Sequence, residues 1–90
     1  MLRITEVREN DSELRLRLDG TLTTESFVDL EAAWREKSNQ TAIVILDMAG
    51  VSFMNEPAAR KLAAIKGERL QLVNCSPFIA ALLETVERSK

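Results

Sequence analysis

A run of apolar residues from Ala42 to Leu46 constrains the fold of this chain more than any other feature. The run is rich in Ile and Val, and an Asp-x-x-Gly sequence at Asp47–Gly50 follows it, which predicts a turn. A segment with helical spacing comes next, up to Ala64. A continuous apolar strand is typical of a parallel sheet that helices cover on both faces. The sequence therefore predicts an α/β protein built around this strand.

A hairpin is predicted before this strand. Residues 14–18 alternate leucine with arginine, so we expect a strand with one buried and one solvated face. Residues 2–7 start with the same alternation and lose it at Val7, which indicates a strand with a bulge. Polar turn formers at residues 9–12 connect the two strands, and Asp19-Gly20 is expected to end the hairpin.

Three further segments have the spacing of amphipathic helices. The first is capped by Thr23 or Thr24 and fades near residues 38–39. The second is expected to close at Gly67, and the third to start with Ser76 as its cap and Pro77 at its first position. Their apolar positions are Phe27, Leu30, Ala33 and Trp34; Ala59, Leu62 and Ile65; and Phe78, Ile79, Leu82, Leu83 and Val86.

With a fourth strand at residues 70–73, the element order is β-β-α-β-α-β-α. This order predicts a small α/β domain with a mixed four-stranded sheet, in which right-handed crossovers put the helices mainly on one face. Ninety residues suffice for one domain, so residues 1–90 are expected to form a single unit.

Composition excludes several classes of protein. The net charge of −2 argues against nucleic-acid binding, which usually requires a basic excess. The sequence contains no apolar run near the ~20 residues of a membrane span and no apolar signal-peptide core, so we expect a cytoplasmic protein. With one cysteine and no histidine, the chain has neither an internal disulfide nor the usual zinc ligands, and we expect no metal and no cofactor.

Three motifs, taken in order, resemble the STAS domain family of bacterial anti-sigma factor antagonists. Leu16–Thr23 is similar to the family's second strand and following turn, and Asn74–Pro77 to its Ser-Pro helix start. Val44–Met54 reads Val-Ile-Leu-Asp-Met-Ala-Gly-Val-Ser-Phe-Met, close to the family's Val-x-Leu-Asp-Leu-Ser-x-Val-x-Phe strand and loop. The resemblance implies the fold predicted above, and it implies that residues 1–90 lack the family's last strand and helix.

The chain departs from the family at its phosphorylation motif. The family continues with Asp-Ser-Ser/Thr-Gly, whose first Ser is phosphorylated by a partner kinase, whereas this chain has Asn-Glu-Pro-Ala at residues 55–58. Glu56 therefore stands where the resemblance places the phosphorylated Ser. A helix start favours negative charge; phosphoserine carries about −1.5 to −2 and Glu about −1 permanently. Either Glu56 holds a phospho-like state, or it is a helix N-terminal acid without regulatory meaning.

The resemblance implies a surface for a protein partner along Asp47 to Lys61. Each residue also has a structural interpretation: Asp47 as a turn-forming side chain, Pro57 as a plain helix start, and Arg60 and Lys61 as a solvated basic face. No catalytic set or Gly-rich phosphate loop is present, so we expect no enzyme. The candidate partner-binding residues are Asp47, Ser52, Met54, Asn55, Glu56, Pro57, Arg60 and Lys61.

The function that these motifs favour is a non-catalytic interaction module resembling an anti-sigma factor antagonist. Its expected partner is a kinase-like anti-sigma factor or another signalling protein, without nucleic acid and without insertion into a membrane. The alternative is an accessory STAS subunit that docks on the ATPase of a membrane lipid or anion transporter. An incompletely covered sheet also makes a homodimer possible.

Overall fold

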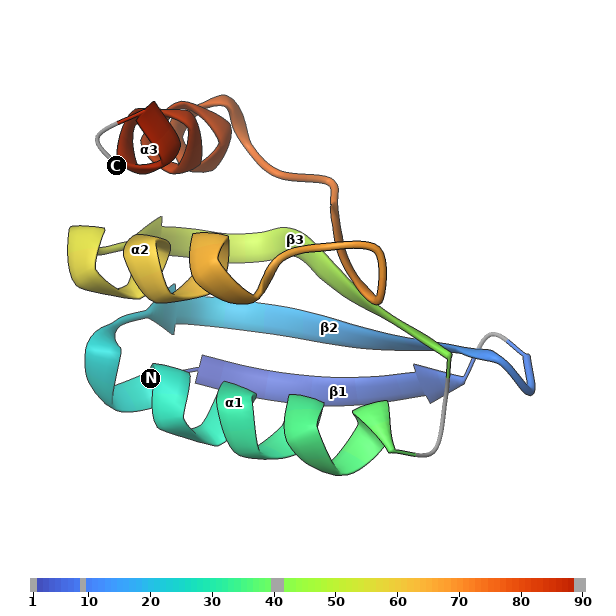
Figure 1. Cartoon of the computed structure of the whole chain (residues 1–90). Helices are drawn as coiled ribbons and strands as arrows, with labels where there is room; N and C mark the ends of the chain where they lie inside the picture. The colour runs from blue at the N-terminus through green and yellow to red at the C-terminus, as the bar shows by residue number, and fades with distance from the viewer. Residues whose placement is uncertain (1, 9, 40–41, 89–90) are drawn as a thin grey trace.

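The computed structural model describes residues 2–8, 10–39 and 42–88, and it confirms the predicted element order (Figure 1). The elements are β1 (Leu2–Arg8), β2 (Glu13–Leu22), α1 (Thr24–Ser38), β3 (Ile43–Met54), α2 (Glu56–Ile65), β4 (Leu70–Val73) and α3 (Pro77–Arg88).

The sheet has the spatial order β1-β2-β3-β4. β1 is antiparallel to β2, and the pairs β2–β3 and β3–β4 are parallel. Both parallel connections move in the same direction across the sheet, so right-handed crossovers put α1 and α2 on the same face. Figure 1 shows these two helices side by side in front of the strands, with α3 next to α2. The predicted mixed sheet with helices mainly on one face is confirmed.

The core lies between the sheet and this helical layer. Leu16 of β2, Leu46 of β3 and Leu30 of α1 are at most 1% exposed. The prediction that residues 42–46 are covered on both faces is wrong, because Ile43 and Ile45 keep intermediate exposure on the other face of the sheet. Within the described residues no helix lies over that face, so it is only partly shielded from water.

β1 contains no bulge. It pairs with β2 residue for residue from Leu2 to Arg8. Val7 faces the open side of the sheet and is 42% exposed, opposite Arg15. Glu6 lies on the helical side, where Lys37 Nζ approaches its carboxylate at 3.2 Å. The alternation is lost in the sequence because an ion pair replaces an apolar contact at Glu6.

β2 and β3 both continue through their predicted turns. β2 passes through Asp19 and Gly20 to Leu22, and Gly20 takes a φ of 111° that suits glycine. β3 passes through Asp47–Gly50, where two of its residues lie opposite the single residue Leu18 of β2. Such a bulge bends the strand without ending it, so the predicted turns are irregular pairings inside longer strands.

The helix starts agree with the sequence, while one helix end and one core position do not. Thr23 caps α1, and Ser76 Oγ accepts a bond from Ile79 N–H at 3.2 Å. α2 ends at Ile65 with Lys66 in an extended conformation, so Gly67 does not close it. Phe78 was expected in the core stripe of α3 but is 52% exposed.

Candidate functional site

The start of α2 is fixed by a side-chain cap. Asn55 Oδ1 accepts a bond from Ala58 N–H at 3.0 Å, and Asn55 N–H donates to the carbonyl of Leu22 at 3.2 Å. The first bond satisfies one of the free N–H groups of the helix start, and the second ties that start to the end of β2. These two bonds therefore fix where α2 starts relative to the end of β2.

Glu56 and Arg60 form an exposed ion pair on this helix. Glu56 Oε1 lies 2.6 Å from the Arg60 guanidinium, with one helical turn between the two residues. Both side chains remain more than half exposed, at 59% and 52%. An exposed i,i+4 pair contributes only about 0.3–0.5 kcal/mol, so its position is more informative than its contribution to stability. The negative charge of Glu56 lies at the positive end of the α2 dipole.

Three of the other candidate residues are exposed, at positions 52, 57 and 61. Pro57 is in the first turn of α2, and Lys61 follows Arg60; both are exposed. Ser52 is exposed in β3 and donates a bond through Oγ to the carbonyl of Gly20 at 3.2 Å. Met54 is 1% exposed and belongs to the core. A partner therefore cannot contact the Met54 side chain without disrupting the core, so Met54 does not belong to the candidate surface.

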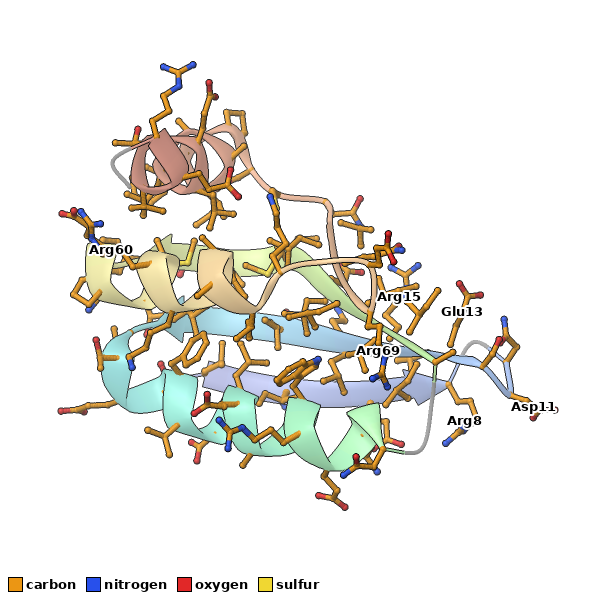
Figure 2. All side chains as sticks on the ribbon, in the orientation of Figure 1. Arg8, Asp11, Glu13, Arg15, Arg60 and Arg69 are labelled. Atoms are coloured by element: carbon orange, nitrogen blue, oxygen red, sulfur yellow. The ribbon has the colours of Figure 1, made fainter. Side chains whose placement is uncertain are left out.

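Asp47 is separated from Glu56 by the distal half of β3. Met54 lies seven positions after Asp47 in the strand, which corresponds to roughly 20 Å of extended chain at about 3.3 Å per residue. Figure 2 shows Arg15, the ion-pair partner of Asp47, far from Arg60 along the strands. One compact contact surface therefore does not include both Asp47 and Glu56.

The environment of Asp47 instead indicates a structural role. Asp47 Oδ1 accepts bonds from Ala49 N–H and from Asn74 Nδ2, each at 3.1 Å, and Oδ2 lies 3.1 Å from the guanidinium of Arg15. The bond from Ala49 and then that from Asn74 lower the pKa of the Asp47 carboxyl; burial opposes them, and Arg15 lowers the pKa further. The carboxylate thus stabilises the bulge in β3, in agreement with the structural interpretation from the sequence.

An exposed aromatic pair was missed by the sequence analysis. The rings of Phe53 and Phe78 stack with centroids 6.2 Å apart and an interplanar angle of 21°, and the side chains are 46% and 52% exposed. Ile79, Leu83 and Val86 are buried at helical spacing, and Phe78 lies directly before the first of them. This position at the margin of the apolar stripe is the one sequence feature that indicates exposure of Phe78. The contact with Phe53 could not be read from the sequence because 25 positions separate the two residues.

Two features are absent from the described part of the chain. No group of three or more His, Cys, Asp or Glu residues there could hold a metal ion. No helix within the same residues is long and apolar enough to cross a membrane.

Comparison with known proteins agrees with the motifs and the topology. A family model described as the STAS domain matches residues 5–89. The chain belongs to the STAS domain family. No curated protein matches this STAS domain significantly.

Solved structures share the fold of this STAS domain at low sequence identity. The unphosphorylated form of the anti-sigma factor antagonist SpoIIAA is 20% identical, with a TM-score of 0.66 over 91% of this chain and 82% of that one. The phosphorylated form of the Bacillus cell fate determinant SpoIIAA is 18% identical, with a TM-score of 0.63 over 96% and 86%. A DUF3478 protein with a SpoIIAA-like fold from Shewanella loihica is 14% identical, with a TM-score of 0.60 over 99% and 79%.

Proposed function

We propose that this STAS domain is a non-catalytic interaction module of the anti-sigma factor antagonist type. Its partner is a kinase-like anti-sigma factor or a related signalling protein in the cytoplasm, and the contact surface is the exposed part of α2 from Glu56 to Lys61. The observation that carries the proposal is the Glu56–Arg60 pair, whose two side chains are more than half exposed on a helix start that Asn55 caps. A capped and charged helix start is suited to partner selection, because charge complementarity mainly governs on-rate and specificity.

In this proposal Glu56 supplies a negative charge that no kinase or phosphatase changes. One of the similar structures is SpoIIAA in a phosphorylated form, so one protein of this fold is found in a phosphorylated state. A carboxylate at the first position of α2 interacts favourably with the helix dipole and needs no modification to do so. The affinity of the domain for its partner then stays constant, whereas a serine at this position would allow phosphorylation to change that affinity.

The first experiment is a tagged pull-down from native lysate with the wild type and Glu56→Ser, followed by mass spectrometry for partners and phosphate. Glu25→Ser is the matched control, because Glu25 is an exposed acid in the first turn of α1. We expect one signalling partner whose recovery changes with Glu56→Ser and not with Glu25→Ser. Phosphate found only on the introduced serine of Glu56→Ser would support the replacement of a switch. Equal recovery with all three proteins would contradict a role for Glu56.

A second pair of variants tests the surface itself. Lys61→Glu reverses an exposed charge on α2, and Arg8→Glu makes the same change on β1. Figure 2 shows Arg8 at the other end of the molecule from Arg60. We expect Lys61→Glu to slow association with the recovered partner several-fold at low salt and Arg8→Glu to leave it unchanged. Recovery of a transporter ATPase in place of a signalling kinase would favour the accessory-subunit alternative.

A further inference from the structure

The two edges of the sheet differ in how they are protected against pairing with another strand. Edge strands usually carry charges, a proline or a bulge that blocks such pairing. β1 has the charged residues Arg3, Glu6 and Arg8 among its seven positions. β4 reads Leu-Gln-Leu-Val, with no charge and no proline, and pairs with β3 in regular register. Among the described strands, β4 is therefore the unprotected edge.

A groove with a volume of about 520 Å³ adjoins β4 and separates it from α3. Its apolar lining includes Leu70 and Leu72 of β4, Cys75, and Ala80 and Leu83 of α3. Strand addition at a sheet edge combines main-chain hydrogen bonds with pockets for alternate side chains. An open edge beside an apolar groove provides both.

The charges around the groove are already paired within the molecule. Lys66 Nζ lies 2.7 Å from Glu87 Oε1, and the guanidinium of Arg88 pairs with Glu84. Among the described residues that line the groove, these pairs leave no isolated charge for an ionic occupant to neutralise. The groove therefore favours an uncharged strand with alternate apolar side chains.

The backbone of Leu72 faces this open edge. Val44 N–H donates to the carbonyl of Arg69 at 2.8 Å, so the polar groups of Arg69 point toward β3. Because these groups alternate in direction along a strand, those of Leu70 and Leu72 point away from β3. The Leu70 carbonyl already accepts a bond from Gly67 N–H at 3.0 Å, which agrees with this direction. Leu72 remains with both its N–H and its carbonyl directed outward.

We propose that the occupant of this edge is β4 of a second copy of the chain, paired antiparallel about a two-fold axis beside Leu72. β4 itself is uncharged and has apolar residues at alternate positions, so it has the chemistry that the groove favours. An antiparallel pair centred on Leu72 satisfies the N–H and carbonyl of both copies at once. The contact joins two sheets into one and leaves α2 free, so it is independent of the proposed partner surface.

Sedimentation velocity over a wide concentration range tests the dimer. Ala80→Arg fills the groove, while Ala81→Arg adds the same side chain to an exposed neighbour on α3 outside the groove. We expect the wild type and Ala81→Arg to shift toward twice the monomer mass as concentration rises, and Ala80→Arg to remain a monomer. A wild type that stays monomeric up to millimolar concentration overturns the proposal, as does a dimer that Ala80→Arg does not weaken.

Two charge variants at Gln71 identify the strand that forms the contact. Gln71 is exposed in β4, so Gln71→Lys and Gln71→Glu leave the core unchanged. The antiparallel pairing brings the two Gln71 positions within reach of each other across the axis. We expect each variant alone to dimerise several-fold more weakly than the wild type at low salt, and an equimolar mixture to recover the affinity. Wild-type affinity for each variant alone would place the interface elsewhere and overturn the proposal.

Discussion

Asn74 Nδ2 donates a hydrogen bond to Asp47 Oδ1 at 3.1 Å, although 27 positions separate the two residues in the sequence. Asn74 follows β4 directly and takes a φ of 59°, a left-handed conformation that asparagine adopts more readily than most residues. The bond therefore connects the turn after β4 with the bulge of β3. Because this bond helps to lower the pKa of the Asp47 carboxyl, we expect the stability of this part of the sheet to depend on pH through Asp47.

Replacing Asp47 with Asn should reduce stability in a pH-dependent way. The fold lowers the pKa of Asp47, so its stabilising contribution is complete above the usual aspartate pKa of about 3.9 and is lost as pH falls through the lower value of the folded state. We expect Asp47→Asn to lower the free energy of unfolding by about 1.5–3 kcal/mol at neutral pH, since hydrogen bonds to a charged group are lost.

Urea unfolding, followed by the fluorescence of the single tryptophan, measures this effect at several pH values. The difference between the wild type and Asp47→Asn should be constant above about pH 5 and should shrink below about pH 4. Asp29→Asn, at an exposed position of α1, is the control and should leave stability nearly unchanged. A difference for Asp47→Asn that is the same at pH 3 and pH 7 would contradict the role of the carboxylate.

Gly50→Ala and Gly67→Ala should have opposite effects on the stability of the domain. A Cβ at Gly50 would lie 2.0 Å from Asp19 Oδ1 and 2.7 Å from the carbonyl oxygen of Leu18, so β2 or β3 must shift. We expect Gly50→Ala to cost about 1–3 kcal/mol, as overpacking does. A Cβ at Gly67 meets nothing within 4 Å and its φ is not positive, so Gly67→Ala should be neutral or stabilise by up to about 1 kcal/mol. Thermal unfolding of both variants measures this contrast, and equal melting temperatures would refute it.

Adjacent positions of α3 should differ in the cost of truncation. Ile79 is fully buried, so Ile79→Ala should cost about 2–5 kcal/mol. Phe78 is half exposed and contacts the ring of Phe53, so Phe78→Ala should cost only about 0.5–1.5 kcal/mol. Chemical denaturation of the two variants gives both values. A larger loss for Phe78→Ala than for Ile79→Ala would show that the aromatic pair belongs to the core.

Cys75 should react slowly with alkylating reagents. Burial raises the pKa of its thiol, and the positive charge of Lys66 partly opposes this increase. At low protein concentration and neutral pH, we expect iodoacetamide to modify Cys75 more slowly than free cysteine, with a rate that rises only at higher pH. Lys66→Ala should slow the reaction further, and Lys66→Arg, which keeps the charge, should not. A Lys66→Ala variant that reacts faster would mean that access to the thiol, and not its pKa, controls the rate.

Local patterns in the sequence were sufficient for the element order and for the helix starts. Thr23 and Ser76 cap α1 and α3 as predicted, and the structure adds Asn55 as the cap of α2. Each side chain bonds an N–H group three residues away, so these caps depend on nearby sequence. The alternation in residues 14–18 likewise identified the buried face of β2, because side-chain direction in a strand follows from position alone.

The strand ends required the tertiary structure. Asp19-Gly20 and Asp47–Gly50 have the composition of turns, and in isolation either sequence could reverse the chain. In the fold, each segment is held in the ladder by the strand beside it, and the extra residue in β3 is accommodated as a bulge. Pairing between strands thus overrides the local preference for a turn.

The sequence by itself determined which elements form and the place of Glu56 at the start of a helix. The tertiary structure alone decided which candidate residues share a surface: it buried Met54, separated Asp47 from Glu56, and stacked Phe53 on Phe78. The physical reason is the distance along the sequence between the residues that interact. Helix caps and strand alternation arise from contacts within a few residues, whereas exposure and the proximity of side chains depend on packing between segments that are far apart in the sequence.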